Sequence, residues 1–167
     1  LEDYNSNDEN FFVKSHKRLM ADLIPSSWKD RNQGLGIFKV KNVENLALTC
    51  ENVPCLMKDL FLYFKVLEEI ILIKSCVFHY EMEFIHPFLD GNGRMGRLWQ
   101  TLILMQQYPV FEYLSFETLI SKDQEKYYTA LSESDKSGKS TKFIEYMLEV
   151  IDISISELLD FNNRTLN

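Results

Sequence analysis

The chain has little cysteine, proline and glycine for its length. Its 167 residues include three cysteines, four prolines and six glycines. Three cysteines, an odd number, do not make the disulfide framework of a small secreted domain, so we expect a reducing, cytoplasmic location. Because only four prolines punctuate the chain, most of its apolar residues lie in long segments with helical spacing.

Basic charge and long hydrophobic runs are also scarce. Eighteen Lys and Arg residues against 25 Asp and Glu residues give a net charge of −7. This balance disfavours a broad contact with nucleic acid, although a local basic patch could still bind a phosphate. The most apolar stretch, residues 56–77, is interrupted by six charged residues, so we expect no transmembrane segment and no membrane partner.

The composition is that of a globular protein with one domain. Hydrophobic residues make up 46% of the chain, enough for a core without covalent staples. The apolar spacing predicts helices over residues 11–23, 52–71, 75–85, 97–107, 122–132 and 141–159. Alternation around residues 37–40 predicts one β-hairpin. We therefore expect an all-α bundle with one hairpin over residues 11–159, a polar N-terminal extension (1–10) and a frayed tail (160–167).

Glycine and arginine are concentrated in one segment. Three of the six glycines and two of the five arginines fall within residues 91–97, and one of the three histidines lies just upstream. The segment reads HPFLDGNGRMGR, residues 86–97. This concentration marks the segment as the candidate site.

The order of residues in this segment suits a phosphate ligand. Gly91 and Gly93 let backbone N–H groups approach a ligand without an intervening Cβ, and the N-terminus of the next helix attracts anions. Arg94 and Arg97 are three residues apart, so they lie on one face of the first helical turn. There both guanidinium groups can fork onto phosphate oxygens.

Two further residues add a metal ligand and a base. Asp90 suits a Mg²⁺ ion held between a carboxylate and phosphates. His86 can take up a proton near neutral pH. A simple turn followed by two solvated arginines would also contain glycine, but it would not require all these residue types in this order. Phosphate, metal and base together indicate phosphoryl or nucleotidyl transfer.

With these residues the sequence resembles the Fic-domain family. The family's motif is His-x-Phe-x-Asp/Glu-Gly-Asn-Gly/Lys-Arg-x-x-Arg, and residues 86–97 match every defined position. The likeness extends over most of the chain. It implies the Fic fold, a helical bundle with a hairpin, and ATP-dependent transfer of AMP to a Tyr, Thr or Ser hydroxyl of a target protein. A flap near residues 36–48 would hold the target segment by β-augmentation.

The resemblance implies roles for the first half of the motif. His86 would be the general base that deprotonates the target hydroxyl. Asp90 would hold Mg²⁺ against the α- and β-phosphates of ATP. Phe88 would belong to the core and orient the loop without touching substrate.

The second half of the motif would hold the nucleotide. By the same resemblance, Gly91, Asn92 and Gly93 would line an anion hole, to which Asn92 could donate through its amide. Arg94 and Arg97 would hold the β- and γ-phosphates and position the pyrophosphate leaving group.

The adenine contacts rest on weaker signals. Tyr127 and Tyr128 look like the aromatic pair that borders the base in similar proteins, but aromatic residues at helical spacing are equally typical of a core. Asp135 stands where similar proteins often have Asn. We expect His79 to be a hydrogen-bonded core histidine, and we expect the cysteines to be buried thiols of a reduced core, not zinc ligands.

Two other functions remain open from the sequence. The same loop with the nucleotide reversed would make a protein kinase, as in the related Doc toxin, and the fold could also serve as a non-catalytic nucleotide-binding or interaction module. Similar proteins often have an inhibitory Ser/Thr-x-x-x-Glu-Gly/Asn helix whose Glu pairs with the second motif arginine, here Arg97. Neither end of this chain matches that pattern. An upstream inhibitory helix or a separate antitoxin-like partner could supply the inhibition.

Overall fold

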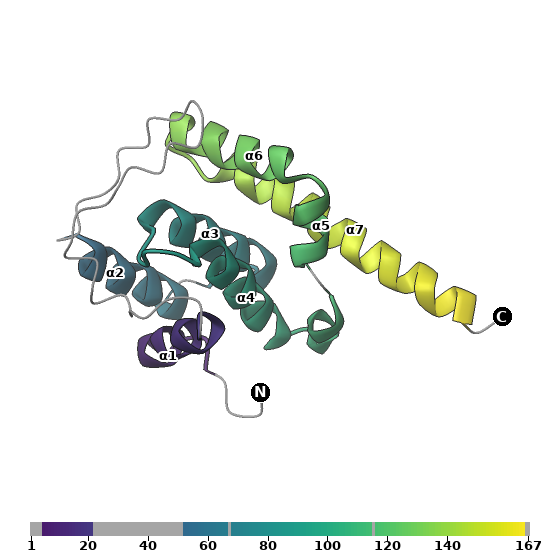
Figure 1. Cartoon of the computed structure of the whole chain (residues 1–167), viewed down its shortest axis with the longest axis horizontal. Coiled ribbons are helices and arrows are strands. Elements are labelled where there is room, and N and C mark those ends of the chain that lie inside the picture. The colour runs from purple at the N-terminus through teal and green to yellow at the C-terminus, as the bar shows by residue number, and fades with distance from the viewer. Residues whose placement is uncertain (1–4, 22–51, 67, 115, 166–167) are drawn as a thin grey trace.

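The computed structural model describes residues 5–21, 52–66, 68–114 and 116–165. These residues form helices and no strand (Figure 1). The elements are α1 (Glu9–Leu19), α2 (Val53–Val66), α3 (Ile71–Ile85), α4 (Asn92–Met105), the 3-10 helix η2 (Pro109–Tyr113), α5 (Phe116–Lys122), α6 (Gln124–Ser137) and α7 (Thr141–Thr165). The all-α prediction is confirmed for these residues, whereas the predicted hairpin and flap lie outside them.

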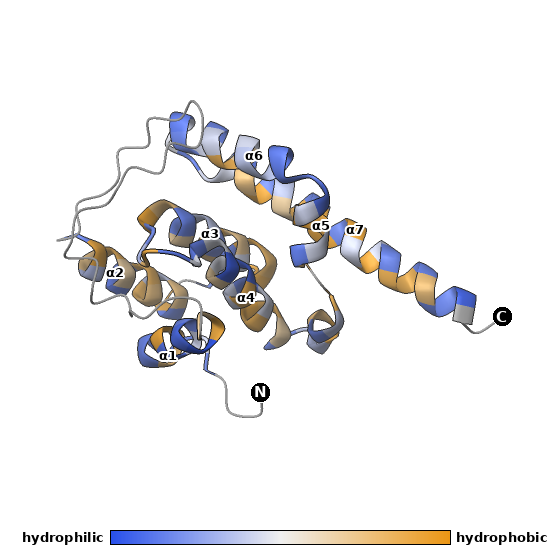
Figure 2. Ribbon diagram, viewed as in Figure 1, coloured by the Kyte–Doolittle hydropathy of each residue, from blue (hydrophilic) through white to orange (hydrophobic). Residues whose placement is uncertain are grey.

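Helices α3 and α4 form the centre of the bundle. They pack against each other, with α2 against α3 and the pair α6 and α7 joined to α3 through α7 (Figure 1). Figure 2 shows that α2 is mostly hydrophobic, that α4 is hydrophilic near its start and hydrophobic near its end, and that α6 is mostly hydrophilic. No helix in the described part of the chain is long and apolar enough to cross a membrane.

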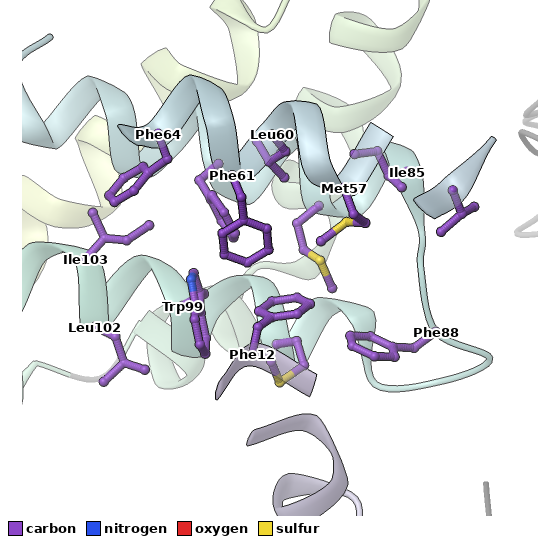
Figure 3. Packing of buried hydrophobic residues seen from close by; sticks show 14 residues of the cluster. Phe12, Met57, Leu60, Phe61, Phe64, Ile85, Phe88, Trp99, Leu102 and Ile103 are labelled. Carbon is purple, nitrogen blue, oxygen red and sulfur yellow. The ribbon is translucent and has the colours of Figure 1, made fainter. Parts of the chain in front are cut away.

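An aromatic cluster connects α1 to the helices that carry the candidate site. The ring of Phe12 lies 4.8 Å from Trp99, 5.5 Å from Phe88, 5.6 Å from Phe61 and 6.2 Å from Phe78, measured between centroids (Figure 3). All five side chains are at most 4% exposed. Since truncating one buried Phe to Ala costs about 3–5 kcal/mol, this cluster is a major source of stability for the site.

Helix α1 begins earlier than the apolar spacing predicts. The Asp8 carboxylate accepts a hydrogen bond from the Asn10 N–H at 2.8 Å, and this cap sets the helix start at Glu9. The Ser6 carbonyl accepts from Nε1 of Trp99 at 3.1 Å, and Ser6 is fully buried. Part of the segment 1–10, expected to be a polar extension, therefore packs on the fold.

Other helix boundaries also differ from the prediction. The two helices predicted over 52–71 and 75–85 are present as α2 and α3, but α2 ends at Val66 and α3 begins at Ile71. The boundary was misplaced because consecutive buried helices give one unbroken apolar pattern. Helix α6 continues through residues that were expected to form a loop, and it ends where Gly138 adopts φ 64°. Helix α7 continues to Thr165, six residues beyond the predicted helix end, so residues 160–165 of the expected tail are helical.

Candidate functional site

The candidate site lies at the turn between α3 and α4. His86 ends α3 with φ 53°, a left-handed conformation that other non-glycine residues of the described chain do not adopt. Gly91 is the N-cap of α4 with φ 83°. The N–H groups of the first turn of α4 have no acceptor within the helix, so they are available to an anion in front of the loop.

Asn92 fastens the loop from inside. Its side-chain Oδ1 accepts from the Phe88 N–H at 2.9 Å, and its Nδ2 donates to the Phe88 carbonyl at 2.8 Å. Asn92 is 2% exposed. We expected this amide to donate to the anion, but it is bonded to the Phe88 backbone instead. Asn92 can therefore contribute to the predicted anion hole through its backbone N–H and not through its side chain.

Helix α1 supports the loop from below. The imidazole of His16 stacks on the Phe88 ring, with centroids 3.6 Å apart and planes 3° apart, and its Nε2 lies 2.9 Å from the Asp90 carbonyl oxygen. Burial lowers the pKa of His16, so the ring is neutral and its Nε2–H donates to that carbonyl. Phe88 is 1% exposed, as its predicted core role requires. Nothing in the sequence indicated that His16 holds the loop.

The orientation of His86 suits a proton acceptor. Its Nδ1 lies 3.4 Å from the Glu83 carbonyl oxygen. A carbonyl can only accept, so this contact favours the tautomer with the proton on Nδ1 and the lone pair on Nε2. The left-handed backbone at this residue is a strained conformation of the kind that concentrates at functional sites.

Three glycines let other groups approach the backbone of the loop and helix. A Cβ on Gly91 would lie 2.6 Å from the Met20 sulfur. A Cβ on Gly93 would lie 3.1 Å from Arg97 Nη1 and 3.2 Å from Glu83 Oε1, and one on Gly96 would lie 2.5 Å from Cδ2 of His79. Packing therefore opposes a Cβ most strongly at Gly96, whereas at Gly93 the neighbouring side chains would need to shift by only a few tenths of an ångström. At Gly91 the left-handed backbone, φ 83°, opposes a Cβ as well.

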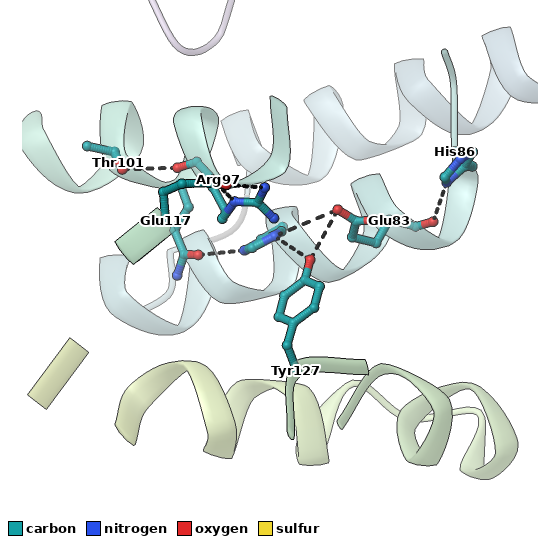
Figure 4. Close-up of polar contacts among 8 residues, drawn as sticks. Glu83, His86, Arg97, Thr101, Glu117 and Tyr127 are labelled. Carbon is teal, nitrogen blue, oxygen red and sulfur yellow. Dashed lines mark hydrogen bonds and ion pairs between the residues drawn. The ribbon is translucent and has the colours of Figure 1, made fainter. Parts of the chain in front are cut away.

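The two arginines are paired with carboxylates. Arg94 Nη2 lies 3.6 Å from Asp90 Oδ2, at a solvent-exposed position. Arg97 makes a two-point contact with Glu117 of α5, through its Nε and through Nη2 at 3.0 Å from Oε1 (Figure 4). The sequence did not predict Glu117, which is twenty residues away and in no recognisable pattern. A phosphate at Arg97 would meet this carboxylate as a competitor.

Asp90 is the one acidic side chain of the loop itself. Its carboxylate is 62% exposed, and Oδ1 accepts from the Gly91 N–H at 2.6 Å. Within the described residues, no group of three or more His, Cys, Asp or Glu side chains could hold a metal ion. A single carboxylate fits a Mg²⁺ ion that takes most of its ligands from phosphates and water, and it does not fit a metal held by the protein alone.

The two tyrosines proposed for adenine lie in different environments. Tyr127 is 3% exposed, and its hydroxyl lies 3.1 Å from Glu83 Oε1 and from His79 Nε2 (Figure 4). These are the contacts of a core residue. Tyr128 is 51% exposed and can present its ring to a ligand. The carboxylate of Asp135 accepts from the Tyr80 hydroxyl at 2.9 Å.

The remaining sequence predictions concern His79 and the cysteines. His79 is fully buried with both ring nitrogens in hydrogen bonds, which confirms its core role, and burial lowers its pKa to about 3. Cys76 is also buried, and burial raises the pKa of its thiol to about 12. Cys55, which was expected to be buried, is exposed because it faces outward near the start of α2.

Taken together, these contacts define a helical protein with a glycine-rich turn at a helix N-terminus and a histidine beside it. The family model for the Fic/DOC family matches residues 7–104, more than half of the chain. The chain belongs to the Fic/DOC family.

Curated and solved relatives agree with this assignment. The "Probable protein adenylyltransferase" of Aquifex aeolicus is 37% identical over 65 residues, which are 39% of this chain and 18% of the relative. The protein adenylyltransferase Fic of Nematostella vectensis is 32% identical over 83 residues, 48% of this chain and 18% of the relative. The crystal structure of a Fic family protein from Desulfovibrio desulfuricans has a TM-score of 0.89 and 41% identity, and the match covers 96% of this chain and 50% of that one. The chain thus spans half or less of these relatives.

Proposed function

We propose that this chain is a protein adenylyltransferase that moves AMP from ATP to a Tyr, Thr or Ser hydroxyl of a target protein. The observation that supports it best is the turn at residues 86–97, where a histidine precedes a helix N-terminus with two arginines on its first turns. Two relatives carry the name protein adenylyltransferase, one of them as probable, and this supports the same activity. The target hydroxyl would be presented by the predicted flap near residues 36–48.

The backbone of the loop would hold the phosphates. The N–H groups of Asn92 and Gly93 would form the anion hole, because they lie at the positive end of α4. The Gly91 N–H would join them once it leaves the Asp90 carboxylate. Arg94 and Arg97 would bind the β- and γ-phosphates and so hold the pyrophosphate leaving group. Arg97 must exchange its contact with Glu117 for the phosphate. Tyr128 would border adenine.

His86 would act as the general base. Nε2 would take the proton of the target hydroxyl as its oxygen attacks the α-phosphorus, and the bond to the pyrophosphate oxygen would break. The Glu83 carbonyl at Nδ1 would keep the ring in the tautomer that leaves Nε2 able to accept. The histidine therefore serves the attacking group, whereas the arginines serve the leaving group.

A Mg²⁺ ion would be held by Asp90 together with the phosphates. When bound it would offset the negative charge that gathers on the phosphates during transfer. Asp90 also contacts Arg94, so this carboxylate must turn from the arginine to serve a metal.

Label transfer tests this proposal. A cell lysate with Mg²⁺ receives ATP labelled at the α- or the γ-phosphate, with the wild-type chain or with His86→Ala. Protein-bound α-label that disappears with His86→Ala is the expected result. Label from the γ-phosphate alone would replace the proposal with a kinase of the Doc type.

Nucleotide binding separates the remaining outcomes. His86→Ala should bind ATP nearly as well as the wild type, because the base acts on the target hydroxyl. Absence of both labels together with absence of ATP binding in calorimetry would refute nucleotide transfer. ATP binding without transfer, even after addition of a candidate target, would favour a non-catalytic nucleotide-binding module.

A further inference from the structure

A chain of buried hydrogen bonds lies beneath the loop, and the proposed function leaves it without a role. Glu83 Oε1 is 3.1 Å from the Tyr127 hydroxyl, which is 3.1 Å from Nε2 of His79. Nδ1 of His79 is 2.7 Å from Oε1 of Gln100, and Nε2 of Gln100 is 3.3 Å from Sγ of Cys76. Figure 4 shows Tyr127 reaching from α6 to Glu83 on α3. This series of hydrogen bonds joins α3, α4 and α6 directly behind the candidate site.

The direction of these hydrogen bonds follows from the Gln100 amide. Its NH₂ group faces Cys76, so its oxygen must accept from Nδ1–H of His79. A neutral imidazole with its proton on Nδ1 has a lone pair on Nε2, so it accepts from the Tyr127 hydroxyl. The hydroxyl has then used its one proton, and its oxygen can only accept from Glu83.

We propose that Glu83 carries a proton in the nucleotide-binding form and acts as an uncharged positioning residue beneath the phosphate-binding loop. Its O–H donates to the Tyr127 oxygen and completes a chain in which every group is neutral and has a partner. This inference rests on the proposed function, because it concerns the same phosphate site. Glu83 does not touch the nucleotide. It acts through Arg97 and the loop.

The surroundings of Glu83 explain why its charge matters to a phosphate. Oε1 of Glu83 and Nη1 of Arg97 both lie within 3.2 Å of the position that a Cβ on Gly93 would occupy. An ionised carboxylate there would offset the charge of Arg97 and repel an anion at the loop. The other groups that face this site are His79 on the same helix, Tyr127 on α6 and, beyond Arg97, Glu117 on α5.

The pKa shifts of Glu83 and His79 agree with the donor and acceptor roles assigned to these hydrogen bonds. Burial raises the pKa of Glu83 to about 7, against smaller lowering effects from Tyr127 and Arg97. Burial lowers the pKa of His79 to about 3, so the 4.0 Å contact between His79 and Glu83 is not an ion pair near neutral pH. A phosphate at the loop disfavours ionisation of Glu83 still further. Nucleotide binding above pH 7 should therefore take up a proton.

The size of the effect follows from this pKa. At pH 8 a carboxyl with a pKa of about 7 is protonated in roughly one molecule in ten, so ATP affinity of the wild type should be up to about tenfold weaker than at pH 6. Glu83→Gln copies the protonated state, because its NH₂ group can donate to the Tyr127 oxygen. It should lack this weakening. Glu81→Gln is the matched control on the same helix and should behave as the wild type does.

Calorimetry of ATP binding in buffers of different ionisation enthalpy measures the proton directly. We expect the wild type and Glu81→Gln to take up more protons at pH 8 than Glu83→Gln does. The terminal phosphate of ATP is the same in all three titrations, so its own protonation cancels in this difference. ATP binding with equal proton uptake in all three would overturn the inference and leave the proposed function intact.

A second measurement needs no nucleotide. Carbon-13 NMR of the chain labelled at glutamate carboxyls should show one signal that titrates near pH 7 in the wild type and in Glu81→Gln and that is absent from Glu83→Gln. If all the glutamate carboxyls titrated below pH 5.5, Glu83 would be ionised at neutral pH and the inference would be wrong, whatever the chain does with ATP.

Discussion

Gly96→Ala tests the close packing of α3 against α4. A Cβ at this position would lie 2.5 Å from Cδ2 and 2.9 Å from Nε2 of His79, both far inside contact distance. The ring cannot swing aside easily, because it is fully buried and bonded to Gln100 and Tyr127. We therefore expect the substitution to destabilise the fold.

The magnitude can be estimated from three effects. Overpacking a core costs about 1–3 kcal/mol, and a buried polar group that loses its partner costs about another 1–3 kcal/mol. Replacing glycine by alanine inside a helix returns about 1 kcal/mol. The free energy of unfolding should fall by about 3 kcal/mol, whereas an unobstructed helical glycine would give a gain.

Urea unfolding followed by circular dichroism measures this change. Gly138→Ala is the control, because a Cβ there meets nothing within 4 Å and its only penalty is the left-handed backbone at φ 64°, about 1 kcal/mol. If Gly96→Ala were as stable as the wild type or more stable, the packing argument would be refuted. A loss no larger than that of Gly138→Ala would also contradict it.

Three further predictions concern Arg97, its partner Glu117 and the thiol of Cys76. Arg97→Ala should weaken ATP binding about tenfold or more, because it removes a charge-assisted hydrogen bond, while AMP binding should change little. If calorimetry showed equal losses of affinity for ATP and AMP, Arg97 would not bind the γ-phosphate. Glu117→Gln should tighten ATP binding by at most about fivefold, because its carboxylate is 61% exposed and well screened; weaker binding in the same titration would contradict competition for Arg97. Cys76 should resist thiol reagents in the native chain, because its raised pKa and full burial leave no accessible thiolate; peptide mapping after brief labelling would reveal any exception.

The sequence predicted much of the candidate site because its signals are local. Residues 86–97 are consecutive, and glycine, arginine and histidine at these spacings indicate a phosphate loop before any tertiary contact is known. The role of Asn92 could not be predicted in this way. An amide beside two glycines suits an anion hole as well as a loop fastener, and only the Phe88 backbone at 2.8–2.9 Å decides between them.

Contacts between residues that are far apart in the sequence could not be predicted from local patterns. Glu117 is one of many acidic residues in a chain with net charge −7, and nothing in its neighbours marks it as the partner of Arg97. Glu83 stands out even less, because its importance comes from burial between helices. Helix ends were also missed where polar residues continue the exposed side of a helix, as in α6 up to Gly138.

The contact of His16 with the Asp90 carbonyl joins residues 74 positions apart. Helix α1 leaves the ribosome before the loop that it supports is synthesised, so the site is completed by closure of a long segment of chain. In the folded protein, loss of this contact would separate α1 from the loop. Detachment of α1 would release the loop while α3 and α4 stay paired, so heating or mild denaturant should abolish ligand binding before the helices melt.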